Sequence, residues 1–422
     1  MVVLKRDIPT IHFWISREIT NMSLATNQLL TGFKICDFTR VLSGPYCTRL
    51  LSDLGAEVYK IEKPNEGDEI RHIVPQMDAE ATDQSAYFVR VNAGKKSIAL
   101  DFTKPEALEV VKDIVLQSDV VVENFSPGIM AKYKLDYESL KAIKPDLVYC
   151  SISGFGQTGP LKNLQAYAHL INAFSGMMEL ERDVIKPPRV SNLQVADVLA
   201  GAHAFGLVCA ALLRRSKTGQ GAYLDISMLE CLICADDVNF SALLNGHEAH
   251  RMPRASMIIH PVGEKHIAMQ LGGAPGMWEK LAKIMSRSDL IHDERFSTGP
   301  ARRKNWPAVL EIVHAWLDSF QTVQEVLDLL TPERFPAVPM MQPEEIIEHP
   351  HLHFRKAFTT LAHPKREEGV RITAPPFHID GDHLPPPKSA PWKIGQNTID
   401  VLENLLHYDQ EKITALKLNG LI

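Results

Sequence analysis

Two short stretches of this chain combine residue types that can do chemistry. In SISGFGQTGP, Gly154, Gly156 and Gly159 have the G-x-G-x-x-G spacing of dinucleotide-binding turns. In QVADVLAGAHAFG, Asp197 precedes an apolar run, a position typical of a helix N-cap. A helix N-terminus stabilises an ionised carboxylate, and an ionised carboxylate can attack an acyl carbon. The first stretch would bind NAD, whereas the second would supply a nucleophile.

The glycine stretch lacks part of what a dinucleotide turn requires. Such a turn follows a strand, opens directly into a helix and has an acidic residue about 20 positions later. The strand is present as LVYCSIS, but Pro160 follows the last glycine and the next helical pattern starts near Ala166. We therefore expect a turn that leads toward a site helix, and an NAD-dependent dehydrogenase is the less favoured alternative.

The elements around these stretches alternate between strand and helix. Short apolar runs separated by amphipathic segments predict right-handed crossovers and a mainly parallel sheet in an α/β fold. The expected strands are 33–38, 56–64, 97–102, 119–125, 146–153 and 222–228. The expected helices in this part are 45–55, 104–117, 166–176, 197–215 and a long one that ends near residue 244.

The 422 residues are enough for two domains, with a polar boundary at NGHEAHRMPRAS. We interpret residues 1–30 as an N-terminal extension and 31–250 as the first part of a large domain. Residues 251–350 are expected to form a smaller domain, with a strand at KHIAMQL and helices at 276–285, 306–320 and 322–330. Residues 351–422 begin Pro-rich and end in a helix at QNTIDVLENLLH.

The composition of the chain indicates which classes of binding partner and which location to expect. The net charge of −6 argues against nucleic acid or an anionic membrane as the main partner. The six cysteines are expected to be free thiols in a reducing cytoplasm, and no second CxxC or His pair completes a metal site. The sequence has no uninterrupted apolar run of about 18 residues, and the N-terminus makes a poor signal peptide. These features favour a cytoplasmic location.

Several longer blocks then carry a resemblance over roughly residues 31–422. ICDFTRVLSGPYCTRLLSDLGAEVYKIEKPNEGDEIR, NAGKKSIALDF, VVENFSPGIM, YCSISGFGQTGP and the later VADVLAGAHAFGLVCAALLRRSKTGQGAYLDISMLE and ITAPPF follow one another in the order found in family III CoA-transferases. The chain resembles that family, to which alpha-methylacyl-CoA racemase is related. The resemblance implies a Rossmann-like large domain formed by both chain ends, a smaller α/β domain and an interlocked homodimer.

The resemblance also implies a reaction. Asp197 matches the family nucleophile, which takes an acyl group as an anhydride and CoA as a thioester. A CoA thioester is then a substrate together with a free carboxylic acid, and no cofactor is held permanently. The positions matching family CoA contacts are Val41, Leu42, Lys63, Arg71, Leu100, Asn124, Phe125 and Lys132. Thr103 departs from the pattern, because formyl-CoA transferase has a lysine there.

Three points remain open in the sequence. The racemases pair the aspartate with a histidine, whose matching position here is Tyr167, as in transferases; His169, two residues on, is expected to face elsewhere on a helix. Arg189 or His169 could pair with a second carboxylate, which favours a dicarboxylate such as succinate, malate, mesaconate or glutarate. Gly272 and Gly273 in LGGAPG form either a mobile lid or a tight turn. A non-catalytic CoA-binding protein is the remaining alternative.

Overall fold

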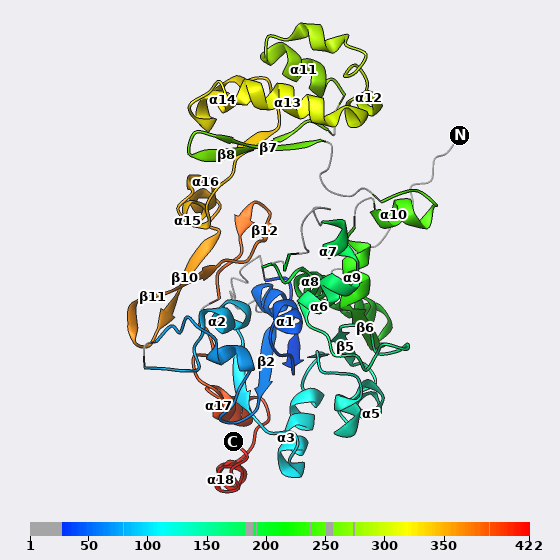
Figure 1. Cartoon of the computed structure of the whole chain (residues 1–422). Helices are drawn as coiled ribbons and strands as arrows, with labels where there is room; N and C mark the ends of the chain where they lie inside the picture. Colours follow the sequence, from blue (N-terminus) through cyan, green and yellow to red (C-terminus); the bar gives the residue numbers. More distant parts are fainter. Residues whose placement is uncertain are drawn as a thin grey trace, which may run out of the picture.

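The computed structural model describes residues 28–78, 80–181, 189–190, 192–236, 239–249, 256–272, 275–387 and 389–422. Its large domain is built on a six-stranded parallel sheet with strand order β3-β2-β1-β4-β5-β6 (Figure 1). The strands are β1 (Lys34–Asp37), β2 (Glu57–Glu62), β3 (Lys96–Ala99), β4 (Val120–Glu123), β5 (Val148–Ser153) and β6 (Ala222–Ser227). Each overlaps a stretch expected to be a strand, with β3 beginning one residue before its predicted start, and the α/β class is confirmed.

Helices cover both faces of this sheet, so its central strands are buried on both sides. Every residue of β4 and β5 is buried, as expected of parallel strands. One apolar cluster joins the sheet to the helices of one face, and a second cluster joins it to those of the other. The helices are α1 (Ser43–Asp53), α2 (Ala86–Asn92), α3 (Pro105–Leu116), α4 (Ile129–Lys132), α5 (Tyr137–Lys141), α6 (Ala168–Phe174), α7 (Met177–Leu180), α8 (Val195–Thr218), α9 (Met228–Cys234) and α10 (Asn239–Leu244).

The strand order places a crevice at the carboxyl ends of the central strands, between β1 and β4. The chain runs outward from β1 through β2 to β3 and then returns to β4 on the other side of β1. The loops that follow β1 and β4 therefore leave the sheet in opposite directions. Ligands of open α/β sheets bind at such a switch point, outside the carboxyl ends of the strands.

Helix α8 is long and apolar enough to cross a membrane by length and composition, with a mean hydropathy of 1.8 in its most apolar window. In the large domain one face of it packs against α1, α9, β5 and β6, while Leu207 and Leu213 are exposed on another face. It begins at Val195, two residues earlier than expected, with Gln194 as its N-cap. The single long helix expected after β6 is also wrong, because α9 ends at Cys234 and α10 begins at Asn239.

The small domain combines a three-stranded antiparallel sheet with four helices over its own apolar core (Figure 1). Its sheet has the order β7-β8-β9, and the buried Trp278 and Phe296 pack together in the core. Its elements are β7 (Met257–Val262), β8 (Lys265–Gln270), α11 (Met277–Ile284), α12 (Gly299–Lys304), α13 (Trp306–Leu317), α14 (Val323–Leu330) and β9 (Ala337–Pro339).

The C-terminal segment returns to the large domain. Asn397 Oδ1 accepts a hydrogen bond from the Ser97 N–H at 3.0 Å and Thr398 Oγ1 accepts one from the Ala99 N–H at 2.9 Å, so this segment covers the edge strand β3. Two hairpins and the three helices α15, α16 and α18 were not expected from the sequence. The elements are α15 (Pro343–Ile347), α16 (Pro350–Phe354), β10 (Phe358–His363), β11 (Arg366–Thr373), β12 (His378–Ile379), β13 (Asp382–His383), α17 (Thr398–Asn404) and α18 (Gln410–Leu418).

Candidate active site

A cavity of about 280 Å³ lies at the switch point, beside the carboxyl ends of β1, β4 and β5. Asp197 reaches it from the first turn of α8. Its lining comes from the loops after these three strands and from α8 and α9. The lining residues are Arg40, Val41, Ser43, Glu69, Asn124, Phe125, Ser126, Pro127, Ile152, Ser153, Gly154, Lys162, Leu164, Gln165, Ala166, Tyr167, Asp197 and Met228.

Asp197 is the third residue of α8 rather than its N-cap, because the helix begins at Val195. Burial raises the pKa of its carboxyl group from 3.8 to about 6, although hydrogen bonds from Ser43 and Ala168 and the positive charge of His169 act in the opposite direction. Burial therefore outweighs the stabilisation expected from the helix N-terminus. At neutral pH the group is still mostly ionised, but it is poorly solvated, which favours nucleophilic attack.

Ser43 links the Asp197 carboxylate to the loop after β1. Its hydroxyl and its backbone N–H both donate toward the Asp197 carboxylate. The Ser43 Oγ in turn accepts a hydrogen bond from Asn124 Nδ2 at 3.2 Å. The Asn124 side chain also forms two hydrogen bonds of 2.8 Å with the backbone of Arg40. It donates to the Arg40 carbonyl and accepts from the Arg40 N–H. The loops after β1 and β4 are thus tied together around the carboxylate.

Three of the predicted CoA contacts meet in this cavity, namely Val41, Asn124 and Phe125. Leu42 is buried beneath the same loop and packs with Ile70, Phe88 and Val91 rather than lining the cavity. Part of the predicted set of CoA contacts therefore lies in the same cavity as Asp197.

The other predicted CoA residues lie outside this cavity. Lys63 is exposed and pairs with Glu66 at 2.6 Å, and Lys132 on α4 lies over the ring of Tyr133. Leu100 is 1% exposed and belongs to the apolar core on one face of the sheet. Thr103 caps its own turn by donating to Asp101 at 2.6 Å.

Arg71 is misplaced as a predicted CoA contact. Its guanidinium is fully buried and forms two hydrogen bonds of 2.7 Å to the carboxylate of Glu62. A third donor is taken by the Asp83 carbonyl at 3.1 Å, and the guanidinium stacks 3.7 Å from the centre of the Phe88 ring. Because these partners surround the cation, Arg71 holds the fold together and does not reach a phosphate.

His169 does not line the cavity, whereas Tyr167 does, so the two side chains face differently as expected. The reason differs in part, because Tyr167 is the N-cap of α6 and has extended backbone. His169 is still close enough to Asp197 to lower the pKa of its carboxyl group, and its buried Nδ1 has no hydrogen-bond partner among the described residues. Tyr167 lines the cavity and is 63% exposed.

Of the remaining candidates that the structure describes, neither Arg189 nor Gly272 lines the cavity at Asp197. Arg189 is exposed and does not line the cavity. Gly272 follows β8 in the small domain, and Gly273 lies outside the described residues, so the lid hypothesis stays a prediction.

The GFGQTGP stretch forms a loop that borders the cavity at Gly154. Gly156 and Gly159 both have φ near +85°, a conformation that glycine adopts easily. The Gln157 N–H donates to the Asp225 carboxylate at 3.1 Å. The next helix after this loop, α6, does not begin until Ala168. The loop therefore lacks the helix N-terminus that holds a pyrophosphate.

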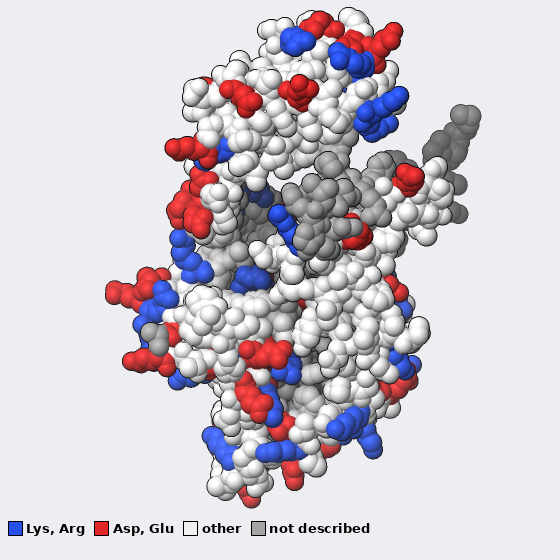
Figure 2. All heavy atoms as spheres, viewed as in Figure 1, with Lys and Arg blue, Asp and Glu red and all other residues white. Residues whose placement is uncertain are grey.

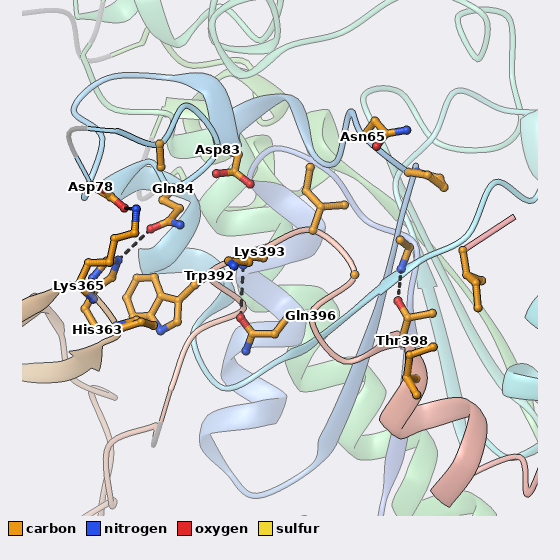
Figure 3. Close-up of a pocket in the computed structure, with 18 of the residues that line it drawn as sticks. Asn65, Asp78, Asp83, Gln84, His363, Lys365, Trp392, Lys393, Gln396 and Thr398 are labelled. Atoms are coloured by element: carbon orange, nitrogen blue, oxygen red, sulfur yellow. Dashed lines mark hydrogen bonds and ion pairs between the residues drawn. The ribbon is translucent and has the colours of Figure 1, made fainter. Parts of the chain in front are cut away.

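A second and larger cavity, of about 850 Å³, lies between the loop after β2 and the C-terminal segment (Figure 3). Trp392 packs edge-on against His363, whose Nε2 is 2.8 Å from Gln84 Oε1. Lys365 pairs with Asp78 at 3.0 Å. Within the described ranges, no group of three or more His, Cys, Asp or Glu side chains is arranged to hold a metal ion.

Comparisons with known proteins agree with this arrangement. A family model described as CoA-transferase family III matches residues 30–398. The succinyl-CoA:glutarate CoA-transferase of Mus musculus is 30% identical over 398 residues, covering 93% of this chain and 90% of that protein. The succinyl-CoA:mesaconate CoA-transferase of Haloarcula hispanica is 32% identical, covering 89% and 96%. The structure of a CAIB/BAIF family protein from Brucella suis superimposes with a TM-score of 0.78 at 31% identity, covering 90% of this chain and all of that one.

Proposed function

Because the chain belongs to CoA-transferase family III, we propose that it moves CoA from an acyl-CoA thioester to a free dicarboxylic acid, with Asp197 as the nucleophile. The observation that carries this proposal is the poorly solvated Asp197 carboxylate in a cavity at the switch point of the sheet. The choice of a dicarboxylate rests on relatives that act on succinyl-CoA with glutarate or mesaconate.

The proposed reaction has four balanced steps. The Asp197 carboxylate attacks the thioester carbonyl, which forms a mixed anhydride and releases CoA thiolate. The thiolate then attacks the aspartyl carbonyl, which gives an aspartyl-CoA thioester and frees the donor acid. The acceptor carboxylate attacks this thioester, forming a second anhydride and releasing the thiolate again. Finally the thiolate attacks the acceptor's acyl carbon, which restores Asp197 and yields the new CoA thioester.

One unpaired cation at the cavity supports an anionic substrate. Arg40 and Lys162 both line the cavity, but Arg40 pairs with Glu69 at 3.4 Å, whereas Lys162 has no ion pair among the residues that the structure describes. Figure 2 shows a hollow between the small and large domains with Lys or Arg side chains exposed at its edge. A carboxylate or phosphate that enters here meets positive charge, which favours binding.

A panel of donors and acids tests the proposal. Succinyl-CoA is incubated with glutarate, mesaconate, malate, oxalate or formate, and the CoA thioesters formed are identified by mass spectrometry. We expect a new thioester with at least one dicarboxylic acid and without any added cofactor. Hydroxylamine should inactivate the enzyme only when acyl-CoA is present, because it traps the activated aspartyl group. Failure to form any new thioester across the panel contradicts the proposal.

One observation favours a second candidate, an acyl-CoA epimerase. His169 is close enough to Asp197 to lower the pKa of its carboxyl group, although it does not line the cavity, and proton exchange at the alpha carbon uses a histidine paired with an aspartate. Incubation of a 2-methylacyl-CoA in deuterium oxide distinguishes the two functions. Deuterium at the alpha carbon without any exchange of CoA would support the epimerase instead of the transferase.

We also propose that the chain acts as a homodimer. Apolar side chains are exposed along α6 and α8, including Leu170, Phe174, Leu207 and Leu213. Clusters of this kind commonly mark protein–protein contacts. Light scattering coupled to size exclusion should give twice the chain mass, and a monomer at micromolar concentration would contradict the dimer.

A further inference from the structure

The loop between β1 and α1 contains a strained backbone at the edge of the active-site cavity. Val41 has φ of +65°, in the left-handed region that β-branched residues rarely adopt. It lines the cavity together with Ser43, which donates to Asp197. Strained residues at functional sites persist when the surrounding structure holds them in place. The question is which residues hold Val41.

Two fully buried, oppositely charged residues grip this loop from below. The Val41 N–H donates to both oxygens of the Asp68 carboxylate, at 3.2 and 3.3 Å. Lys60 Nζ lies 3.0 Å from Asp68 and donates to the Thr39 carbonyl at 2.6 Å. Asp68 and Lys60 are each 1% exposed. One ion pair therefore fixes the backbone on both sides of Arg40.

The charge of Lys60 is maintained in spite of its burial. Burial alone would lower the pKa of Lys60, yet the neighbouring carboxylates of Asp68, Asp37 and Glu62 hold it above the ordinary value. Lys60 thus remains a cation beneath the loop at neutral pH, 3.0 Å from the Asp68 carboxyl group. Neither residue lines the cavity, so they act on it only through the backbone of residues 39–41.

We propose that Asp68 and Lys60 are positioning residues that hold Val41 in its left-handed conformation, so that the cavity is shaped before CoA binds. The inference rests on the proposed function in that CoA is taken as the ligand of this cavity. A preformed loop avoids the ordering cost of binding. Releasing it should weaken CoA binding and slow transfer, and the loss should depend on the strain at Val41.

A double-mutant cycle tests this dependence. Asp68→Asn is combined with Val41→Gly, because glycine adopts the left-handed conformation without strain. Calorimetry measures the dissociation constant for CoA, and transfer is followed in parallel. We expect Asp68→Asn to weaken CoA binding about 30-fold alone and less than about threefold in the Val41→Gly background. Equal losses in both backgrounds would overturn the proposal, because a general structural role predicts no coupling.

Two further variants guard the experiment. Asp53→Asn removes another buried carboxylate, the partner of Arg49 at 2.7 Å, without touching the loop. It should leave CoA affinity unchanged, and a 30-fold loss there would contradict the inference. If Asp68→Asn does not fold, Lys60→Arg keeps the charge but alters the bond to Thr39, and the same cycle applies. Coupling in CoA binding without any transfer by the wild-type protein would remove the proposed function and leave this inference standing.

Discussion

Two cavities of the described structure, the one at Asp197 and the one beside Trp392, differ in size and in chemistry. The larger one, of about 850 Å³, is lined by paired or packed groups such as Lys365 with Asp78 and Trp392 with His363 (Figure 3). The smaller one, of about 280 Å³, contains Asp197, a carboxyl group whose pKa burial raises to about 6. The smaller cavity also lies at the switch point of the sheet, where the loops after β1 and β4 separate. A poorly solvated carboxylate at a switch point is therefore better evidence for a catalytic site than the volume of a cavity is.

The largest expected effect is a loss of transfer when the carboxylate in the smaller cavity is replaced, compared with the same replacement in the larger cavity. Asp197→Asn should lower the transfer rate at least about 1000-fold, because the amide cannot form an anhydride. Asp83→Asn makes the same change in the larger cavity and should leave the rate unchanged. Both rates are measured with the same donor and acid by mass spectrometry. A matching loss in both variants would mean that the cavities are not functionally distinct.

The same substitution should make the protein more stable. The Asp197 carboxyl has a pKa of about 6 in the folded chain and 3.8 as its ordinary value, so the folded state keeps a proton that the unfolded state has released between these values. Stability from this group therefore falls as pH rises from about 4 to about 6, and Asp197→Asn should exceed the wild type by roughly 2–3 kcal/mol at neutral pH.

Urea unfolding at several pH values measures this difference. The gain should shrink as pH falls from about 6 to about 4 and disappear below about 3, where the wild-type carboxyl group is protonated in both states. A variant less stable than the wild type at neutral pH would show that the carboxylate is held by favourable contacts rather than desolvated.

A smaller effect is expected at Ser43, which donates to Asp197. Ser43→Ala removes the hydroxyl donor, so the pKa of Asp197 should rise further and the acidic limb of the pH–rate profile should move to higher pH. Loss of one hydrogen bond to a charged group predicts a rate loss of about 10- to 100-fold at neutral pH. A lower rate with an unmoved limb would assign Ser43 a different role.

These residues show how far the sequence alone reaches. The six strands follow from apolar runs separated by helical segments, because a parallel sheet is buried on both faces. The predicted roles of Asp197 and of the cavity residues Val41, Asn124 and Phe125 rest on the resemblance to family III CoA-transferases. Ser43 gave no signal, because a serine in the first turn of a helix is common and its partner lies far along the chain.

Two differences from the sequence prediction have the same physical origin. The sequence does not show that Glu62 neutralises Arg71 in the interior, so an arginine that matches a family position was predicted to contact CoA. It also does not show that α8 begins at Val195, two residues before the predicted start, with Gln194 as its N-cap. Pairing and helix ends are decided by tertiary contacts, which local patterns do not record.

The smallest expected effect completes the comparison. Lys365 lines the larger cavity, is 57% exposed and pairs with Asp78 and Glu80. Exposed ion pairs contribute little, so Lys365→Ala should change the free energy of unfolding by less than about 1 kcal/mol. Transfer should stay within about twofold of the wild type, because this cavity holds no group that the proposed reaction uses. A large loss of transfer with unchanged stability would show that the larger cavity binds part of a substrate, and size would then have marked a second functional region.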